Sequence, residues 1–86
     1  MNEKQANERY TSASIVPMLD DIYDFITWGD FAKHFFPDHS VTWFYNKMRG
    51  VDGNGGLGGF TDEERKQLKQ SLQKLASSIS ETAAHL

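Results

Sequence analysis

The sequence contains no cysteine and no long apolar run. The absence of cysteine among its 86 residues excludes disulfides, zinc ribbons, haem attachment and thiol catalysis. No uncharged apolar stretch approaches the roughly 20 residues that cross a bilayer, so we expect no membrane partner. The first residues, MNEKQ, lack the basic-then-apolar layout of a signal peptide. Together these absences predict a cytoplasmic protein.

The chain also lacks an excess of positive charge. Nine basic residues stand against twelve acidic ones, which gives a formal net charge of −3. Nucleic-acid-binding domains usually carry a basic surplus, so this balance weighs against that class of function. Hydrophobic residues make up 38% and charged residues 24%, which is typical of a soluble globular protein. The length allows one small domain.

Apolar residues that recur every three or four positions predict an all-α fold of four helices, with no strand of any length. The first predicted helix covers residues 14–26, with Pro17 in its first turn, where the missing N–H costs nothing. Thr27 is the expected N-cap of the second helix, with Asp30 in the capping-box position. Pro37 ends that helix.

The third predicted helix has about ten residues, from a cap at Ser40 to a stop at Gly50. Six of the seven glycines then fall in residues 50–59, which we expect to be a connecting loop without regular structure. Thr61 and Glu64 form a capping box for the last helix. Its apolar positions keep the helical spacing almost to the end of the chain: Leu68, Leu72, Leu75, Ala76, Ile79, Ala83 and Leu86.

These elements predict three parts of the chain. Residues 1–13 are polar and predict a flexible N-terminal arm. Residues 14–80 form the helical domain, and residues 81–86 a C-terminal tail that is either frayed or engaged with a second chain.

Each candidate cofactor or metal motif in the sequence lacks a residue or an element that its chemistry requires, and no catalytic motif is present. Gly53, Gly55 and Gly58 spell G-x-G-x-x-G, but the strand before it and the βαβ unit that dinucleotide binding needs are missing. A calcium loop starting at Asp52 would have Leu57 where the turn requires glycine. The three histidines lack metal-ligand spacing, and there is no G-x-S-x-G motif or plausible triad. We therefore expect neither an enzyme, nor a cofactor, nor a bound metal.

The two middle helices have the layout of a helix-turn-helix. Both are short, Ala32 supplies a small side chain where they would cross, and Phe44 and Met48 would face inward. Residues 40–49 are then the recognition helix. The predicted DNA-contacting residues on it and beside it are Thr42, Tyr45, Asn46, Lys47, Arg49 and Lys33.

The chemistry of these side chains suits DNA. Asn46 and Arg49 can make bidentate contacts to adenine and guanine edges, and Thr42 or Tyr45 can reach phosphates. A solvated helix face is the alternative for each of them. The stretch from Trp28 to Gly50 has three cations against two carboxylates, a thin surplus for binding phosphates.

Several strings in the chain resemble a family of small uncharacterised proteins from gut Bacteroides and their mobile elements. The matching strings are WGDFA from Trp28, SVTWF from Ser40, KMRG from Lys47, Asn54-Gly55, and FTDEE from Phe60. The resemblance covers roughly residues 15–79 and, more distantly, extends to repressor-type helix-turn-helix domains. It implies the fold more than an activity, since that family has none assigned. This chain departs from the pattern in its richer glycine run.

We therefore expect a small helix-turn-helix-like protein that binds double-stranded DNA or takes part in transcription. A homodimer through the last helix would provide the two half-sites that such proteins usually need. The alternative is a non-enzymatic protein–protein interaction module, encoded by a mobile element. The net negative charge and the Leu-rich last helix, which can form an intermolecular seam, favour this alternative.

Overall fold

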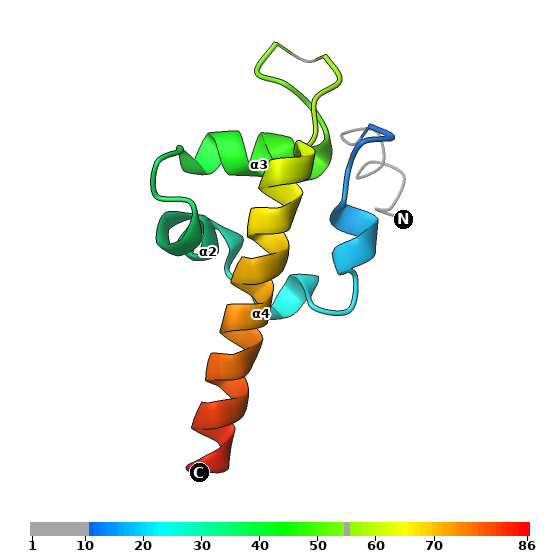
Figure 1. Cartoon of the computed structure of the whole chain (residues 1–86). Helices are drawn as coiled ribbons and strands as arrows, with labels where there is room; N and C mark the ends of the chain where they lie inside the picture. The colour runs from blue at the N-terminus through cyan, green and yellow to red at the C-terminus, as the bar shows by residue number, and fades with distance from the viewer. Residues whose placement is uncertain (1–10, 55) are drawn as a thin grey trace.

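The computed structural model describes residues 11–54 and 56–86 (Figure 1). In this part of the chain the elements are helical, and the only β-type pairing is one isolated bridge, so the predicted all-α class is confirmed. No helix among these described residues is long and apolar enough to cross a membrane. The elements are two 3-10 helices and three α-helices: η1 (Val16–Leu19), η2 (Tyr23–Phe25), α2 (Trp28–Phe35), α3 (Val41–Arg49) and α4 (Asp62–Ala84).

The prediction of one amphipathic helix over residues 14–26 is wrong, and with it the count of four α-helices for the described residues. This segment forms η1 and η2, joined by a turn. Only Met18 and Leu19 in it are strong helix formers, because the remaining residues are β-branched, aromatic, aspartate, serine or proline. A continuous helix would also place several aspartates toward its C-terminal end, where the helix dipole disfavours anions.

Helix α2 begins after Thr27, as predicted, but the predicted capping box does not form. The Thr27 side chain makes no cap hydrogen bond. The Trp28 side chain fixes the start of the helix instead, because it is 3% exposed and its Nε1–H donates to the Tyr23 carbonyl over 3.0 Å. This contact anchors the start of α2 but does not cap it, because the indole N–H is a donor and the free groups of the first helical turn are donors as well.

Helix α3 matches its prediction at both ends. The Ser40 hydroxyl accepts a hydrogen bond from the Trp43 N–H over 3.0 Å, which satisfies one of the free donors of the first turn. At the other end Gly50 adopts φ = 80°, the left-handed conformation that commonly ends a helix.

The core lies where α2 and α3 pack together. Ala32 is almost fully buried, and Phe44 and Met48 are both 0% exposed, so the predicted inward face of α3 is confirmed. The ring of Phe44 lies at the centre of an aromatic cluster, with centroid distances of 5.2 to 6.5 Å to four neighbours: Trp28, Phe31, Phe36 and Phe60.

The segment before η1 closes the C-terminal end of α3. The Thr11 N–H donates to the Arg49 carbonyl and the Thr11 hydroxyl to the Gly50 carbonyl, over 3.1 and 2.6 Å. The Ser14 hydroxyl donates to the Met48 carbonyl over 2.8 Å. These bonds satisfy carbonyls that a helix end leaves without partners. The predicted flexible arm overlaps this segment in residues 11–13, and its residues 1–10 lie outside the described part of the chain.

The glycine-rich segment between α3 and α4 turns back on itself. Val51 and Leu57 form the isolated antiparallel bridge, and the Gly58 N–H donates to the Gly50 carbonyl over 2.8 Å. The Asp52 carboxylate caps the turn, because its Oδ1 accepts from the backbone N–H of Asn54 (2.8 Å) and of Gly56 (2.7 Å). The carboxylate is therefore used by the turn itself.

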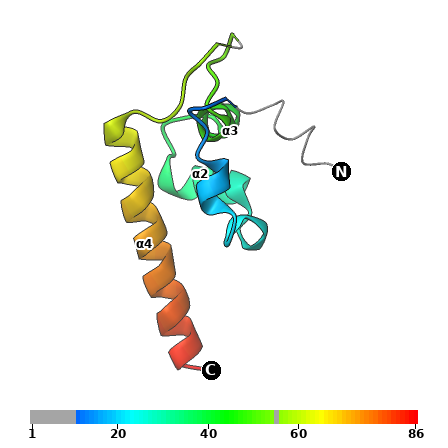
Figure 2. The same cartoon turned by 90° about the vertical axis from the view of Figure 1, so that its right-hand side faces the viewer.

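Helix α4 starts at the predicted capping box, which is confirmed: the Thr61 hydroxyl accepts from the Glu64 N–H, and the Glu64 carboxylate accepts from the Thr61 N–H. Leu68 packs into the core at 4% exposure. From residue 76 to the end of the chain every residue is exposed. Figure 2 shows the C-terminal half of α4 extending away from the other helices.

Candidate functional site

The predicted DNA-contacting residues lie on one helix and its neighbour, but they differ in exposure. Thr42 on α3 and Lys33 on α2 are exposed. The other predicted residues on α3 are half-buried, which means that part of each side chain is engaged in the fold: Tyr45, Asn46, Lys47 and Arg49.

Lys47 links α3 to the start of α4. Its ammonium lies 3.2 Å from the Glu64 carboxylate and donates to the Gly59 carbonyl, also over 3.2 Å. It also lies over the ring of Trp43, at 5.6 Å from the ring centroid. Three partners inside the fold hold this cation, so a structural role accounts for it without any phosphate.

Asn46 and Arg49 contact each other. A guanidinium nitrogen of Arg49 donates to the Asn46 amide oxygen over 2.7 Å, a pairing that the three-residue spacing on a helix favours. The amide oxygen of asparagine is the acceptor that a bidentate contact to adenine uses. Base reading by Asn46 would therefore require this pair to separate.

Tyr45 packs against the hydrophobic core and faces the start of α2. A shallow depression of about 430 Å³ beside α3 brings together three of the predicted residues, Thr42, Asn46 and Lys47. The glycine-rich segment forms its other wall, where Asp52 is a lining residue. The structure thus brings together three of the six predicted DNA-contacting residues, but the carboxylate of Asp52 lies beside them and would repel a phosphate.

The charge of the chain segment that carries the predicted site is balanced. From Trp28 to Gly59 the chain carries three cations, Lys33, Lys47 and Arg49, against three carboxylates, Asp30, Asp38 and Asp52. Affinity for DNA depends on several cations that neutralise phosphates, and here the cation count has no surplus.

A second candidate surface lies at α4, and it is apolar. Phe25 is 87% exposed, Ile79 is 59% exposed and Leu86 is fully exposed. Phe25 and Ile79 line one groove of about 480 Å³ between α2 and α4, and Ile79 and Leu86 line the next depression along α4. We call these three residues the α4 apolar surface. Large apolar side chains that share neighbouring hollows are typical of interaction sites.

Sequence reasoning missed Phe25, because an amphipathic helix was expected over residues 14–26, and the apolar residues of such a helix face the core. The low helix propensity of that segment was the signal that could have exposed the error.

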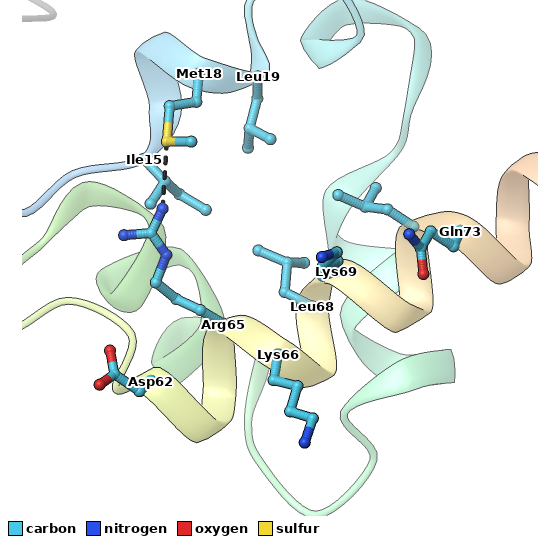
Figure 3. Close-up of a pocket in the computed structure, with 10 residues that line it drawn as sticks. Ile15, Met18, Leu19, Asp62, Arg65, Lys66, Leu68, Lys69 and Gln73 are labelled. Carbon is cyan, nitrogen blue, oxygen red and sulfur yellow. Dashed lines mark hydrogen bonds between the residues drawn. The ribbon is translucent and has the colours of Figure 1, made fainter.

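A further groove, of about 550 Å³, lies between η1 and the first half of α4 (Figure 3). Apolar side chains such as Leu19, Leu68 and Leu72 line it, and Arg65, whose guanidinium donates to the Met18 sulfur over 3.4 Å, stands at its edge. Lys66 and Lys69 also border it, as does Asp62.

No group of three or more histidine, aspartate or glutamate side chains that could hold a metal ion occurs among residues 11–54 and 56–86.

The fold shifts the pKa of the Glu64 carboxyl group. Burial alone would raise the pKa of its carboxyl group. The hydrogen bond from the Thr61 backbone N–H and the nearby Lys47 ammonium outweigh burial, so the pKa of Glu64 lies below its usual value of 4.5.

This lowered pKa predicts how stability depends on pH. The carboxylate binds protons less readily in the folded state, so its contribution is complete above pH 4.5 and is lost as the pH falls through the lower folded-state pKa. We expect Glu64→Gln to lower the free energy of unfolding by about 0.5–1 kcal/mol at pH 7, with a smaller difference near pH 3. Urea denaturation at both pH values measures this loss of stability.

Glu63→Gln is the matched control, because it removes an exposed carboxylate from the same helical turn without touching the capping box. We expect a smaller loss from it at pH 7. If wild type and Glu64→Gln differ by the same free energy of unfolding at both pH values, the assigned role of the carboxylate is contradicted.

Comparison with family models places the chain in a family. The family model described as Domain of unknown function (DUF5053) matches residues 16–86, a range that contains every described helix. No curated protein and no solved structure matches the chain. The expected resemblance to a family of unknown function is confirmed. A source in Bacteroides and a repressor-like helix-turn-helix stay predictions, since the family description mentions neither.

Proposed function

The chain belongs to the DUF5053 family, and we propose that it is a non-enzymatic interaction domain that binds protein through the α4 apolar surface. The observation that carries this proposal is the exposure of Phe25, Ile79 and Leu86 in two adjoining hollows. Exposed apolar side chains that adjoin in this way lose contact with water when a partner covers them, which supplies the driving force for association.

The polar contacts of α3 also favour a protein partner over DNA. Lys47 already has Glu64 and Gly59 as partners, and Arg49 is bonded to Asn46. The net charge of −3 opposes approach to a phosphate backbone.

DNA binding is the second candidate, and the packing of α2 on α3 favours it. Ala32, 1% exposed, lies in the α2 face that packs on α3, as expected for a helix-turn-helix. Thr42 and Lys33 are exposed and available for phosphate contacts, while Asn46 and Arg49 would have to release each other to read bases.

Site-specific photo-crosslinking in the cells that make the protein tests the first candidate. A benzophenone amino acid replaces Phe25 or Ile79, and Ser77, an exposed residue on the opposite side of α4, is the control position. We expect discrete protein adducts from the first two positions and none from Ser77. Adducts at equal yield from all three positions, or from none, would overturn the proposal.

Fluorescence anisotropy with a random duplex tests the second candidate, at about 50 and 200 mM salt. We expect no binding by the folded protein at either concentration. If the protein instead binds the duplex at the lower salt concentration, and Lys33→Ala weakens that binding, the hypothesis of DNA binding would be supported.

A further inference from the structure

Helix α4 is used by the fold only in its first half. Leu68 is buried, and Leu72 and Leu75 are half-buried against the core. All eleven residues from 76 to 86 are exposed, although the helix continues to Ala84. Short helices without tertiary packing are marginally stable in water, so a helix of this length gains from a partner along its second half.

The exposed half carries a stripe that is free of charge. The positions follow the spacing of one helical face, at i, i+3, i+4, i+7, i+8 and i+11, and they are Leu75, Ser78, Ile79, Thr82, Ala83 and Leu86. We call these six residues the α4 stripe. Between its first and last members the only carboxylate is Glu81, which lies off the stripe.

The α4 stripe is continuous with the groove beside α2. Ser78 and Ile79 line both that groove, of about 480 Å³, and the shallower depression along the end of the helix. Phe25 stands at the edge of the groove. An apolar track therefore runs from η2 to the end of α4, along the part of the helix that Figure 2 shows clear of the rest of the chain.

We infer that the occupant of this track is the same stripe of a second copy, with the two α4 helices antiparallel. This inference rests on the proposed function, and it names the partner. The track presents small side chains, Ser78, Thr82 and Ala83, between large ones, which lets two helices approach closely.

An antiparallel alignment fits the stripe to itself. Leu75 meets Leu86 of the second copy, Ile79 meets its Thr82, and each pair occurs twice by symmetry, as a two-fold interface requires. Large side chains then lie opposite smaller ones at the centre of the contact.

Charge and shape also favour the antiparallel direction. A parallel pair would place Lys74 beside Lys74, whereas the antiparallel pair moves these two ammonium groups to opposite ends of the contact. In Figure 1 the helices before α4 lie beside its N-terminal half, so an antiparallel pair would place these helices of the two copies at opposite ends, where they do not compete for space.

The contact is short, so the dimer depends on concentration. The ten helical residues from Leu75 to Ala84 span about 15 Å at a rise of roughly 1.5 Å per residue. A patch of this size is at the small end of specific interfaces and suggests a dissociation constant on the order of micromolar.

The test is the mass of the full chain, measured by sedimentation equilibrium from about 1 to 500 μM, the range around a micromolar dissociation constant. We expect the wild type to pass from monomer to dimer and Ile79→Glu to remain monomeric. Ser77→Glu is the matched control, because it adds the same charge on the opposite side of the same exposed helix, and it should dimerise like the wild type. Equal melting curves show that all three proteins are folded.

Disulfide formation tests the direction of the helices, since the natural sequence has no cysteine. The double variant Leu75→Cys, Leu86→Cys should form covalent dimers on mild oxidation, and Leu86→Cys alone should not. Efficient crosslinking by Leu86→Cys alone would overturn the antiparallel pairing.

The two proposals fail differently. A wild type that stays monomeric at every concentration overturns the second copy as the occupant. In that case the cellular photo-crosslinks decide the proposed function separately: adducts with other proteins preserve it, and the absence of any adduct ends it as well.

Discussion

Replacing Phe44 with alanine is expected to lower the free energy of unfolding by about 3–5 kcal/mol. The side chain is 0% exposed and lies within 6.5 Å, centroid to centroid, of four other aromatic rings. Removing the ring leaves a cavity that these rigid neighbours can fill only in part. Small domains have about 5–15 kcal/mol in total, so the variant should lose a large part of its stability.

Urea denaturation followed by circular dichroism measures this loss. Phe25→Ala is the matched control, because it removes the same ring from a position that is 87% exposed. Its free energy of unfolding should stay within about 0.5 kcal/mol of the wild-type value. Equal midpoints for the two variants would contradict the placement of the core between α2 and α3.

The helix ends that the sequence predicts well are those set by local contacts. Ser40 caps α3, Gly50 ends it, and Thr61 with Glu64 opens α4, all as expected. Each of these signals involves residues within four positions of one another, so a pattern of residue types is sufficient to find them.

The errors occur where distant contacts decide the structure. Residues 14–26 carry helical spacing of apolar residues, but the Ser14 hydroxyl bonds to the Met48 carbonyl, 34 positions away, and their weak helix propensity allows short 3-10 turns. Thr27 has the right neighbours for a cap, but its side chain makes no cap hydrogen bond, and burial of Trp28 in the core holds the start of α2. Spacing alone contains neither contact.

In the candidate site, too, the sequence predicts the local contacts but not the distant ones. The sequence places Lys47 and Arg49 on the outer part of α3 but cannot show that Lys47 is held by Glu64 and the Gly59 carbonyl, residues beyond the glycine-rich segment. The contact between Asn46 and Arg49 is local and was open to prediction from their spacing. The sequence assigns residues 76–80 to the helical domain and only 81–86 to a tail, whereas all residues from 76 to 86 are exposed.

Gly50→Ala is expected to lower the free energy of unfolding by about 2–4 kcal/mol, for two reasons that add. Gly50 has φ = 80°, a conformation that costs an L-residue roughly 1–2 kcal/mol. A Cβ atom there would also overlap the Thr11 hydroxyl and lie only 2.6 Å from the Ser14 backbone nitrogen.

The second effect concerns the segment that closes the end of α3. Residues 11–15 satisfy the carbonyls of Met48, Arg49 and Gly50, and a methyl group at Gly50 would push this segment away. Gly53→Ala is the control, because no atom lies within 4 Å of its added Cβ and φ there is not positive. Thermal melts should show a large loss for the first variant and almost none for the second. Amide exchange should rise at Thr11 and Ile15, whose N–H groups donate to α3. Unchanged protection at these two amides in a destabilised Gly50→Ala would show that the strain of the left-handed conformation acts alone, without displacing the segment.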